Sequence, residues 1–130
     1  MMKRILIVDD QAHVIRVLKL GLEGAGYEVD TASNGSECLV KLCDSHPDCL
    51  VTDIDMPRMG GKELCLAIEK QFPDRTFPIV VLTSRTEMEH RHWTRDISNL
   101  EFMEKPVSIR RLLSSIDKRL ADDNQPGSAT

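Results

Sequence analysis

The sequence has no apolar run that approaches the ~20 residues needed to cross a membrane. Its first strand-like run, Lys3–Val8, is too short to be the apolar part of a signal peptide. Positive charge is not in excess either, because 17 Lys and Arg stand against 21 Asp and Glu, a formal net charge of −4. A basic face for nucleic acid is therefore not expected. We expect a cytoplasmic protein with no membrane partner and no direct contact with nucleic acid.

Neither the histidines nor the cysteines are spaced like metal ligands. His90 and His92 are two residues apart and would point to different faces of a helix, whereas His13 and His46 lie far away in sequence. We expect all four at the surface or the edge of the core. The cysteines match no CxxC pattern and nothing suggests export, so they are expected to be free thiols, buried or half-buried. They are Cys38, Cys43, Cys49 and Cys65.

The chain does contain an alternation of short apolar runs and amphipathic segments. With 130 residues, 41% of them apolar and 29% charged, it is long enough for one globular domain. Continuous apolar runs at Lys3–Val8, Cys49–Thr52 and Ile79–Leu82 predict strands covered on both faces, as in a parallel sheet. Tyr27–Ala32 and Glu101–Glu104 predict two further strands.

Helices are predicted between and after these strands. Apolar residues recur at helical spacing in Gln11–Ala25, Ser36–Ser45, Lys62–Phe72 and a last segment that Ser108 can cap. Residues 86–97 should also be helical but weakly held, because they contain few sizeable apolar residues. The side chains of the other helices expected to face the core are Val14, Val17, Leu18, Leu22, Ala25, Leu39, Val40, Leu42, Leu64, Ala67, Ile68, Ile109, Leu112, Leu113, Ile116 and Leu120, while residues 86–97 have only Met88, Trp93 and Ile97 as sizeable apolar residues.

Five strands alternating with five helices predict an α/β domain with a doubly wound five-stranded parallel sheet, because each crossover is right-handed and needs a covering helix. We assign residues 1–121 to this domain and residues 122–130 to a flexible C-terminal tail. Ligands of such sheets bind beyond the carboxyl ends of the strands. The residues that follow the strands are therefore the candidates for function.

Acidic, hydroxyl and amine side chains stand at those strand ends. They are Asp9, Asp10, Asp53, Thr83 and Lys105. Carboxylates that converge repel each other and raise each other's pKa unless a cation joins them, and short oxygen ligands suit Mg²⁺. A carboxylate beside Mg²⁺ and an ammonium group can attack a phosphoryl group to give an aspartyl phosphate. Asp53 is the best candidate nucleophile because it ends a central buried strand.

The chain resembles the response-regulator receiver domain of two-component signalling over about residues 3–120. The resemblance is carried by Asp9-Asp10 after ILIV, Asp53 in LVTDIDMPRMGG, Thr83 in IVVLTS, and Lys105-Pro106 in FMEKP. It implies a (βα)5, flavodoxin-like receiver fold. It also implies that a sensor histidine kinase or a phosphotransfer protein phosphorylates Asp53 with Mg²⁺, which switches a face that binds a downstream protein. Such a domain is no enzyme beyond its own phosphorylation and dephosphorylation.

The resemblance further implies a metal site in the acidic cluster. Asp10 and Asp53 would bind Mg²⁺ directly, and Asp9 would act largely through water. The backbone carbonyl of Asp55 would be the third protein ligand.

The same resemblance gives roles to the remaining residues. Lys105 would pair with the phosphoryl group. Thr83 would hydrogen-bond that group and would also be a switch residue, shifting toward the phosphate. Phe102, three residues before Lys105, occupies the position of the family's switch aromatic, although simple packing is an alternative for it. The segment EMEHRHWTRDISNLEF departs from the family, which usually has alanines and leucines there. Trp93 in this segment is either a core anchor or an exposed contact for a partner.

Other functions can be weighed against this one. A receiver that only docks and is never phosphorylated is one alternative. A haloacid-dehalogenase-like phosphatase would use Asp53-Ile54-Asp55, but Pro57 stands where that family has Thr or Val, and three elements precede the motif. A flavodoxin-like cofactor protein would need a phosphate loop after the first strand, where DDQAH is acidic and repels phosphate.

Overall fold

The predicted strands all form and make one parallel sheet. A computed structural model describes residues 2–84, 87–90 and 92–124. The strands are β1 (Arg4–Val8), β2 (Glu28–Ala32), β3 (Cys49–Asp53), β4 (Ile79–Thr83) and β5 (Leu100–Glu104), in the order β2-β1-β3-β4-β5. Every residue of β3 and β4 is buried, as their continuous apolar runs predict. The order reverses between β1 and β3, so the site predicted at their carboxyl ends lies at the switch point.

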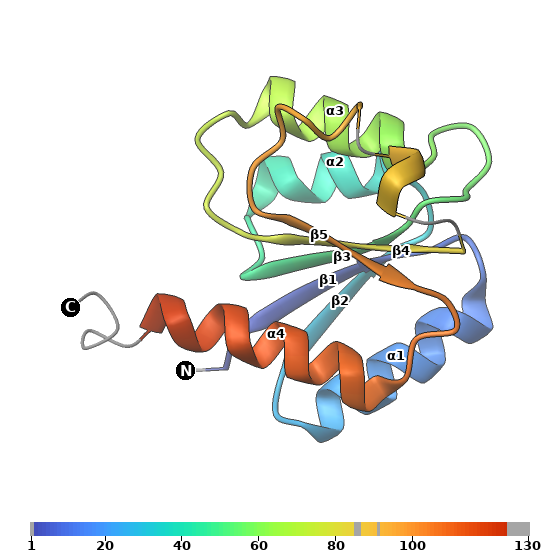
Figure 1. Cartoon of the computed structure of the whole chain (residues 1–130). Helices are drawn as coiled ribbons and strands as arrows, with labels where there is room; N and C mark the ends of the chain where they lie inside the picture. Colours follow the sequence, from blue (N-terminus) through green and yellow to red (C-terminus); the bar gives the residue numbers. More distant parts are fainter. Residues whose placement is uncertain (1, 85–86, 91, 125–130) are drawn as a thin grey trace.

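Helices cover both faces of the sheet (Figure 1). They are α1 (Ala12–Gly24), α2 (Gly35–Asp44), α3 (Gly61–Gln71) and α4 (Ile109–Asn124), with a 3-10 helix, η1, at Glu87–His90. In Figure 1, α2 and α3 lie above the sheet, and α1 and α4 lie below it. Two apolar clusters fill the space, one with Leu64 and Ile68 of α3, the other with Leu112 and Ile116 of α4. The doubly wound α/β fold is thus confirmed, with four α-helices in the described part of the chain.

The prediction of a fifth helix over residues 86–97 is wrong. The residues described there form η1, which is four residues long, followed by turns, while Thr86 and Arg91 lie outside the described residues. The physical reason is the one that made the helix look weak: a helix in a protein is stabilised mainly by packing of an apolar face. This segment has Ile97 in the core and Trp93 half-buried against it, too few residues for such a face.

Some predicted inward positions are also wrong. Val17 is 59% exposed and Val40 66% exposed, and Ala25 is exposed as well. In α2 the buried side chains are Cys38 and Leu42, four residues apart, so Val40 midway between them points to the other side of the helix. In α1 the buried residues are Leu18 and Leu22, with the same spacing, and Val17 lies beside that face rather than on it.

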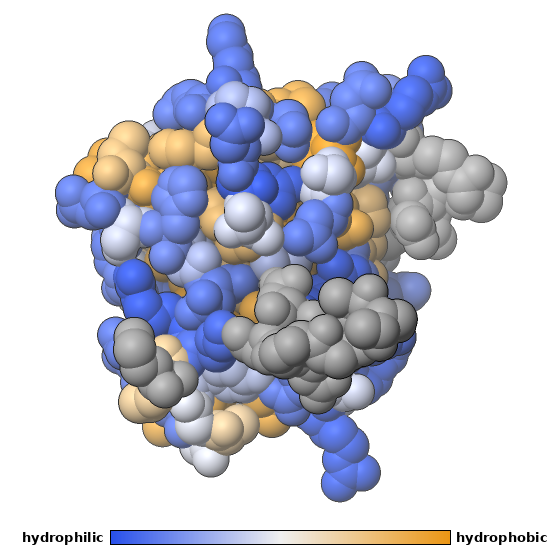
Figure 2. Space-filling model, turned by 90° about the vertical axis from the view of Figure 1, so that its left-hand side faces the viewer, coloured by the Kyte–Doolittle hydropathy of each residue, from blue (hydrophilic) through white to orange (hydrophobic). Residues whose placement is uncertain are grey.

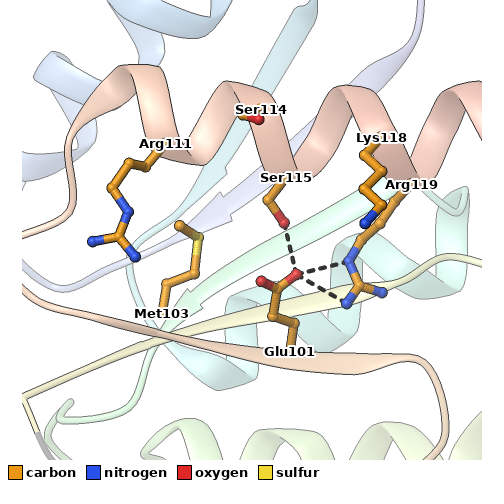
Figure 3. Close-up of a pocket in the computed structure, with 7 residues that line it drawn as sticks. All are labelled: Glu101, Met103, Arg111, Ser114, Ser115, Lys118 and Arg119. Atoms are coloured by element: carbon orange, nitrogen blue, oxygen red, sulfur yellow. Dashed lines mark hydrogen bonds and ion pairs between the residues drawn. The ribbon is translucent and has the colours of Figure 1, made fainter.

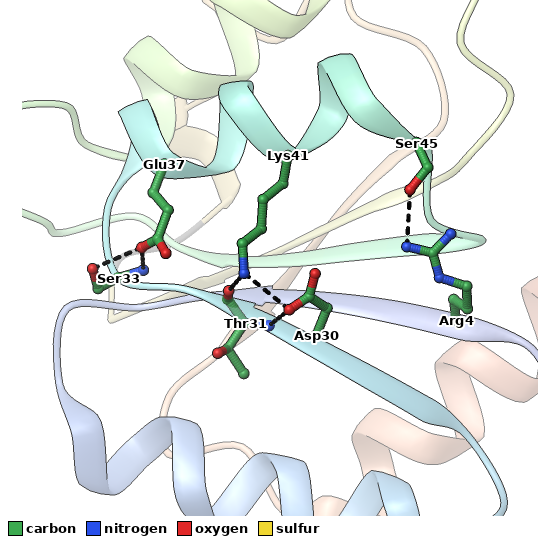
Figure 4. A network of polar contacts seen from close by, with 7 residues as sticks. All are labelled: Arg4, Asp30, Thr31, Ser33, Glu37, Lys41 and Ser45. Carbon is green, nitrogen blue, oxygen red and sulfur yellow. Dashed lines mark hydrogen bonds and ion pairs between the residues drawn. The ribbon is translucent and has the colours of Figure 1, made fainter.

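The edge strand β2 is joined to α2 by polar contacts in addition to the apolar core (Figure 4). Lys41 of α2 makes an ion pair with Asp30 at 2.9 Å and also donates to the carbonyl of Thr31. At the start of the helix, Asn34 accepts a hydrogen bond from the backbone N–H of Glu37. These contacts hold α2 along β2. That edge strand alternates between exposed and half-buried residues before the buried Ala32.

At the other end of the chain, α4 begins as predicted, since the Ser108 hydroxyl accepts from the N–H of Arg111 at 3.1 Å. The helix continues through Asn124, three residues into the stretch assigned to the tail, and residues 125–130 lie outside the described residues. The division at residue 121 stays a prediction.

The surface at the amino ends of the strands mixes hydrophilic residues with smaller apolar areas (Figure 2). Large apolar side chains exposed in the described part of the chain are scattered over several elements: Met2, Val17, Leu20, Val40 and Leu66. Among the described residues, no helix combines the length and the apolar character that crossing a bilayer requires.

Candidate functional site

Three carboxylates meet at the carboxyl edge of the sheet, as predicted. Asp9 and Asp10 follow β1, and Asp53 is the last residue of the neighbouring strand β3. One carboxylate oxygen from each of the three lies within 4.8 Å of those of the other two. Asp9 and Asp53 are buried, and Asp10 is exposed. The sheet therefore brings together side chains that are more than forty residues apart in sequence.

Ile54, the residue after Asp53, is held by backbone hydrogen bonds on both sides. The N–H of Ile54 donates to the carbonyl of Leu82 on β4 at 3.0 Å, and the N–H of Gly61 donates to the carbonyl of Ile54 at 2.9 Å. The start of α3 thus folds directly back onto the end of β3. Gly61 must lack a side chain there, because a Cβ atom would lie 2.6 Å from the carbonyl oxygen of Asp53.

Lys105 places one positive charge on this cluster. Its Nζ lies 2.5 Å from Oδ1 of Asp53, a buried oxygen that has no hydrogen-bond partner among the described residues. The contact is therefore an ion pair whose geometry is not that of a hydrogen bond. The backbone N–H of Lys105 donates to the carbonyl of Thr83 at 2.8 Å, which ties the end of β5 to the end of β4.

One lysine does not balance the charge of three carboxylates, and the pKa of Asp9 is raised. Burial raises the pKa of Asp9, and the neighbouring charge of Asp53 raises it further, while a hydrogen bond from the N–H of Gln11 and the charge of Lys105 lower it. That hydrogen bond, 2.9 Å long, gives Asp9 a part in ordering the turn into α1. A cluster of hard oxygen donors with excess negative charge is the donor set that Mg²⁺ prefers.

The remaining predicted residues lie on the side of β4 and β5. Thr83 is buried, and its hydroxyl contacts Nε2 of His90 at 3.3 Å. Phe102 is half-buried and lies against the core, with its ring stacked on that of His90 at 4.9 Å between centroids. Asp55 is exposed and, together with Trp93, helps to line an open pocket of about 420 Å³.

His90 was missed by sequence reasoning. We expected it at the surface or the edge of the core, but it is only 4% exposed and contacts Thr83, Trp93 and Phe102. Its position three residues before Trp93 was the one available signal, since such pairs can touch in a helical turn. Trp93 itself packs against the core, which favours the anchor interpretation. The cysteines are free as predicted, but Cys43 is exposed.

A second polar pocket lies between β5 and α4 (Figure 3). Its volume is about 570 Å³, and Arg111, Lys118 and Arg119 line it. Glu101 of β5 accepts hydrogen bonds from Ser115 at 2.6 Å and from Arg119 at 2.9 Å. These contacts fasten α4 to the edge strand of the sheet and leave a basic surface beside it.

A doubly wound sheet with an acidic cluster and a lysine at its carboxyl edge defines a class of phosphate-handling α/β domains. The chain belongs to the response regulator receiver domain family, whose model matches residues 5–117. It is 36% identical over 112 residues to the alkaline phosphatase synthesis transcriptional regulatory protein PhoP of Bacillus subtilis. The matched region covers 86% of this chain and 46% of that protein. The chain spans about half the length of the curated relatives it matches.

Solved structures give the same result. The chemotaxis protein CheY4 of Vibrio cholerae matches with a TM-score of 0.83 and 30% identity, covering 91% of this chain and 98% of that one. The response regulator protein TrrA of Thermotoga maritima, solved in complex with Mg²⁺ and BeF, matches with a TM-score of 0.78 and 33% identity, covering 90% and 98%. The chain is thus a receiver domain, a phosphoacceptor of two-component signalling.

Proposed function

We propose that Asp53 is the residue that accepts the phosphoryl group. The observation that carries this proposal is a carboxylate, 4% exposed, at the end of the central strand, with Lys105 on one oxygen and two further aspartates beside it. An oxygen of Asp53 attacks the phosphorus of a phosphohistidine in a sensor histidine kinase or phosphotransfer protein. The N–P bond breaks, its electron pair stays on the imidazole, and an acyl phosphate remains on Asp53.

We propose Mg²⁺ as the cofactor of this step, held by the carboxylates of Asp10 and Asp53 and the backbone carbonyl of Asp55, with Asp9 acting largely through water. The clustered oxygens and the raised pKa of Asp9 fit such a cation. The solved complex of TrrA with Mg²⁺ and BeF supports the choice of metal by similarity. When bound, the ion supplies positive charge that offsets the charge of the phosphoryl oxygens.

Lys105 and Thr83 complete the proposed site. Lys105 already lies against Asp53 and would pair with the phosphoryl group once it is attached. The Thr83 hydroxyl, buried at the end of β4, would donate to a phosphoryl oxygen. Hydrolysis by water would return the carboxylate and inorganic phosphate, so the only reactions catalysed are on the protein itself. We also propose the cytoplasm as its location.

We propose that phosphorylation switches a face made of η1, β5 and α4, and that a downstream protein reads this face. Phe102 is the proposed switch residue, because its half-buried ring touches His90 and Trp93 and lies at the centre of β5. The basic pocket between β5 and α4 in Figure 3 belongs to the same face. Added charge at the carboxyl edge would bias the packing of these side chains.

The test is phosphorylation by acetyl phosphate with Mg²⁺, followed by intact-mass measurement. We expect an adduct of about 80 Da, one HPO₃, which is lost in Asp53→Asn. Asp44→Asn, an exposed acid at the end of α2, is the control and should still form the adduct. Absence of an adduct with every donor tried, a phosphohistidine protein included, would instead indicate a domain that only docks.

A further inference from the structure

A histidine stands between the two residues assigned to switching. His90 ends η1, and its ring nitrogen Nε2 lies 3.3 Å from the hydroxyl oxygen of Thr83 on β4. The same ring stacks on Phe102 of β5, with an angle of 18° between the ring planes. The imidazole therefore touches the end of β4 and the middle of β5 through different parts of the ring.

The other ring nitrogen decides where the imidazole proton lies. The indole N–H of Trp93 points at Nδ1 of His90, with 3.1 Å between the nitrogens. An indole nitrogen can only donate, so Nδ1 must accept and cannot carry a proton. In the neutral ring the proton is then on Nε2, which donates to the hydroxyl oxygen of Thr83.

Donation by His90 has a consequence for the hydroxyl. Since the Thr83 oxygen accepts from one side, its own proton is directed toward acceptors elsewhere. A hydroxyl that accepts one hydrogen bond is also a stronger donor in the next one, because a chain of hydrogen bonds polarises its members. Trp93, His90 and Thr83 are thus ordered donors that run in one direction, toward the carboxyl edge of the sheet.

We propose that His90 is a positioning residue for the phosphorylation site: oriented by Trp93, it holds the Thr83 hydroxyl as a hydrogen-bond donor to the phosphoryl group. This rests on the proposed function. His90 does not touch the reacting atoms, and its effect passes through Thr83. The aromatic rings of Phe102 and Trp93 keep the imidazole in place, with centroids 4.9 Å and 5.7 Å from its own.

The first test uses the wild-type chain without any phosphoryl donor. Long-range ¹H–¹⁵N correlation spectra at pH 7.5 report the imidazole tautomer. We expect His90 to be neutral with its proton on Nε2, and Trp93→Phe, which keeps an aromatic ring but loses the indole donor, to raise the fraction of rings with the proton on Nδ1. A proton on Nδ1 in the wild type would overturn the proposal whatever becomes of the phosphorylation chemistry.

The second test measures the rate of adduct formation with acetyl phosphate and Mg²⁺ in three variants. His90→Phe keeps the stacked ring but loses the donor, and we expect a rate about fivefold lower, the effect of one neutral hydrogen bond. His90→Gln places an amide N–H near the position of Nε2 and should recover most of the loss. His92→Phe, on an exposed residue two positions later, should equal wild type.

The outcomes separate this proposal from the function on which it rests. No adduct on the wild type would refute phosphorylation at Asp53, while the tautomer measurement would still decide the hydrogen-bond chain. Adduct formation in wild type with an unchanged rate in His90→Phe, or an equal loss in His90→Phe and His90→Gln, would refute the positioning role. If His90→Phe fails to unfold cooperatively on heating, the wild-type tautomer and His90→Gln decide.

Discussion

Two connections border the site, and they are held in place by different forces. Between β3 and α3 the chain is fixed by backbone hydrogen bonds at Ile54 and Gly61 and continues into a regular helix with buried Leu64 and Ile68. Between β4 and β5 the described residues form one short 3-10 helix followed by turns. Two single backbone hydrogen bonds, Thr94 to His90 and Ile97 to Thr94, and the side-chain contacts around His90 hold them.

The difference shows how a site can be rigid on one side and adjustable on the other. Backbone bonds and a packed helix open only with a large part of the domain, whereas a few side-chain contacts can rearrange alone. The nucleophile candidate lies on the first connection and the switch candidates face the second. The four predictions that follow test this contrast, from the largest expected effect to the smallest.

Shortening a core residue should cost more on the regular side. Ile68→Ala in α3 removes a side chain that is 0% exposed, and we expect a loss of about 4 kcal/mol in the free energy of unfolding. Ile97→Ala, at 9% exposure in the irregular connection, should cost about 2 kcal/mol because its surroundings can collapse onto the cavity. Urea denaturation measures both. Equal losses would contradict the contrast.

Adding a methyl group at Gly61 tests the close approach of α3 to β3. We expect Gly61→Ala to destabilise the fold by about 2 kcal/mol, because its Cβ meets backbone atoms of Asp53 and Ile54 that cannot move aside. Gly24→Ala is the matched control, since a Cβ at that position meets nothing within 4 Å, and it should be neutral or stabilising. Thermal unfolding of the two variants gives the comparison.

The acidic cluster should destabilise the metal-free protein. Burial raises the pKa of Asp9, so the folded state binds that proton more tightly than the unfolded chain does, and stability falls as pH rises through the folded pKa. Asp9→Asn keeps the acceptor for Gln11 but cannot ionise. With EDTA at pH 7 we expect it to be more stable than wild type.

The advantage of Asp9→Asn should vanish at pH values below the ordinary pKa of an aspartate, where both states of the wild type are protonated. Chemical denaturation at several pH values measures it. An Asp9→Asn variant that is less stable than wild type at pH 7 would mean that Lys105 more than compensates for the charge of the cluster.

The reaction rates of the cysteine thiols give the smallest expected effect, because the comparison of Cys43 with Cys65 requires no substitution in the core. Burial raises the pKa of Cys65, in α3, to about 12, whereas Cys43 is exposed on α2. With an aromatic disulfide reagent at pH 8 we expect one fast thiol, lost in Cys43→Ser. Cys65 should react only as fast as α3 opens. Rapid labelling of Cys65 would show that the regular connection is not the rigid one.

Much of the fold and of the candidate site could be predicted from the sequence, because the strands and the residues at their ends follow from local sequence patterns. The apolar runs before Asp9, Asp53 and Thr83 predict buried parallel strands, and parallel strands place their carboxyl ends at one edge. The failures have local causes too. Val40 was assigned by its apolar character although Cys38 and Leu42 define the buried face, and residues 86–97 were given a helix that their few apolar residues cannot hold.

The sequence by itself determined where the strands lie along the chain, that they form a parallel sheet, and which residues follow them, since burial and crossover handedness leave few ways to arrange such a pattern. Only the tertiary structure decided which of those side chains touch. The ion pair of Lys105 with Asp53 and the contact of His90 with Thr83 depend on rotamers and loop positions. These are set by the packing of the whole domain rather than by any one segment.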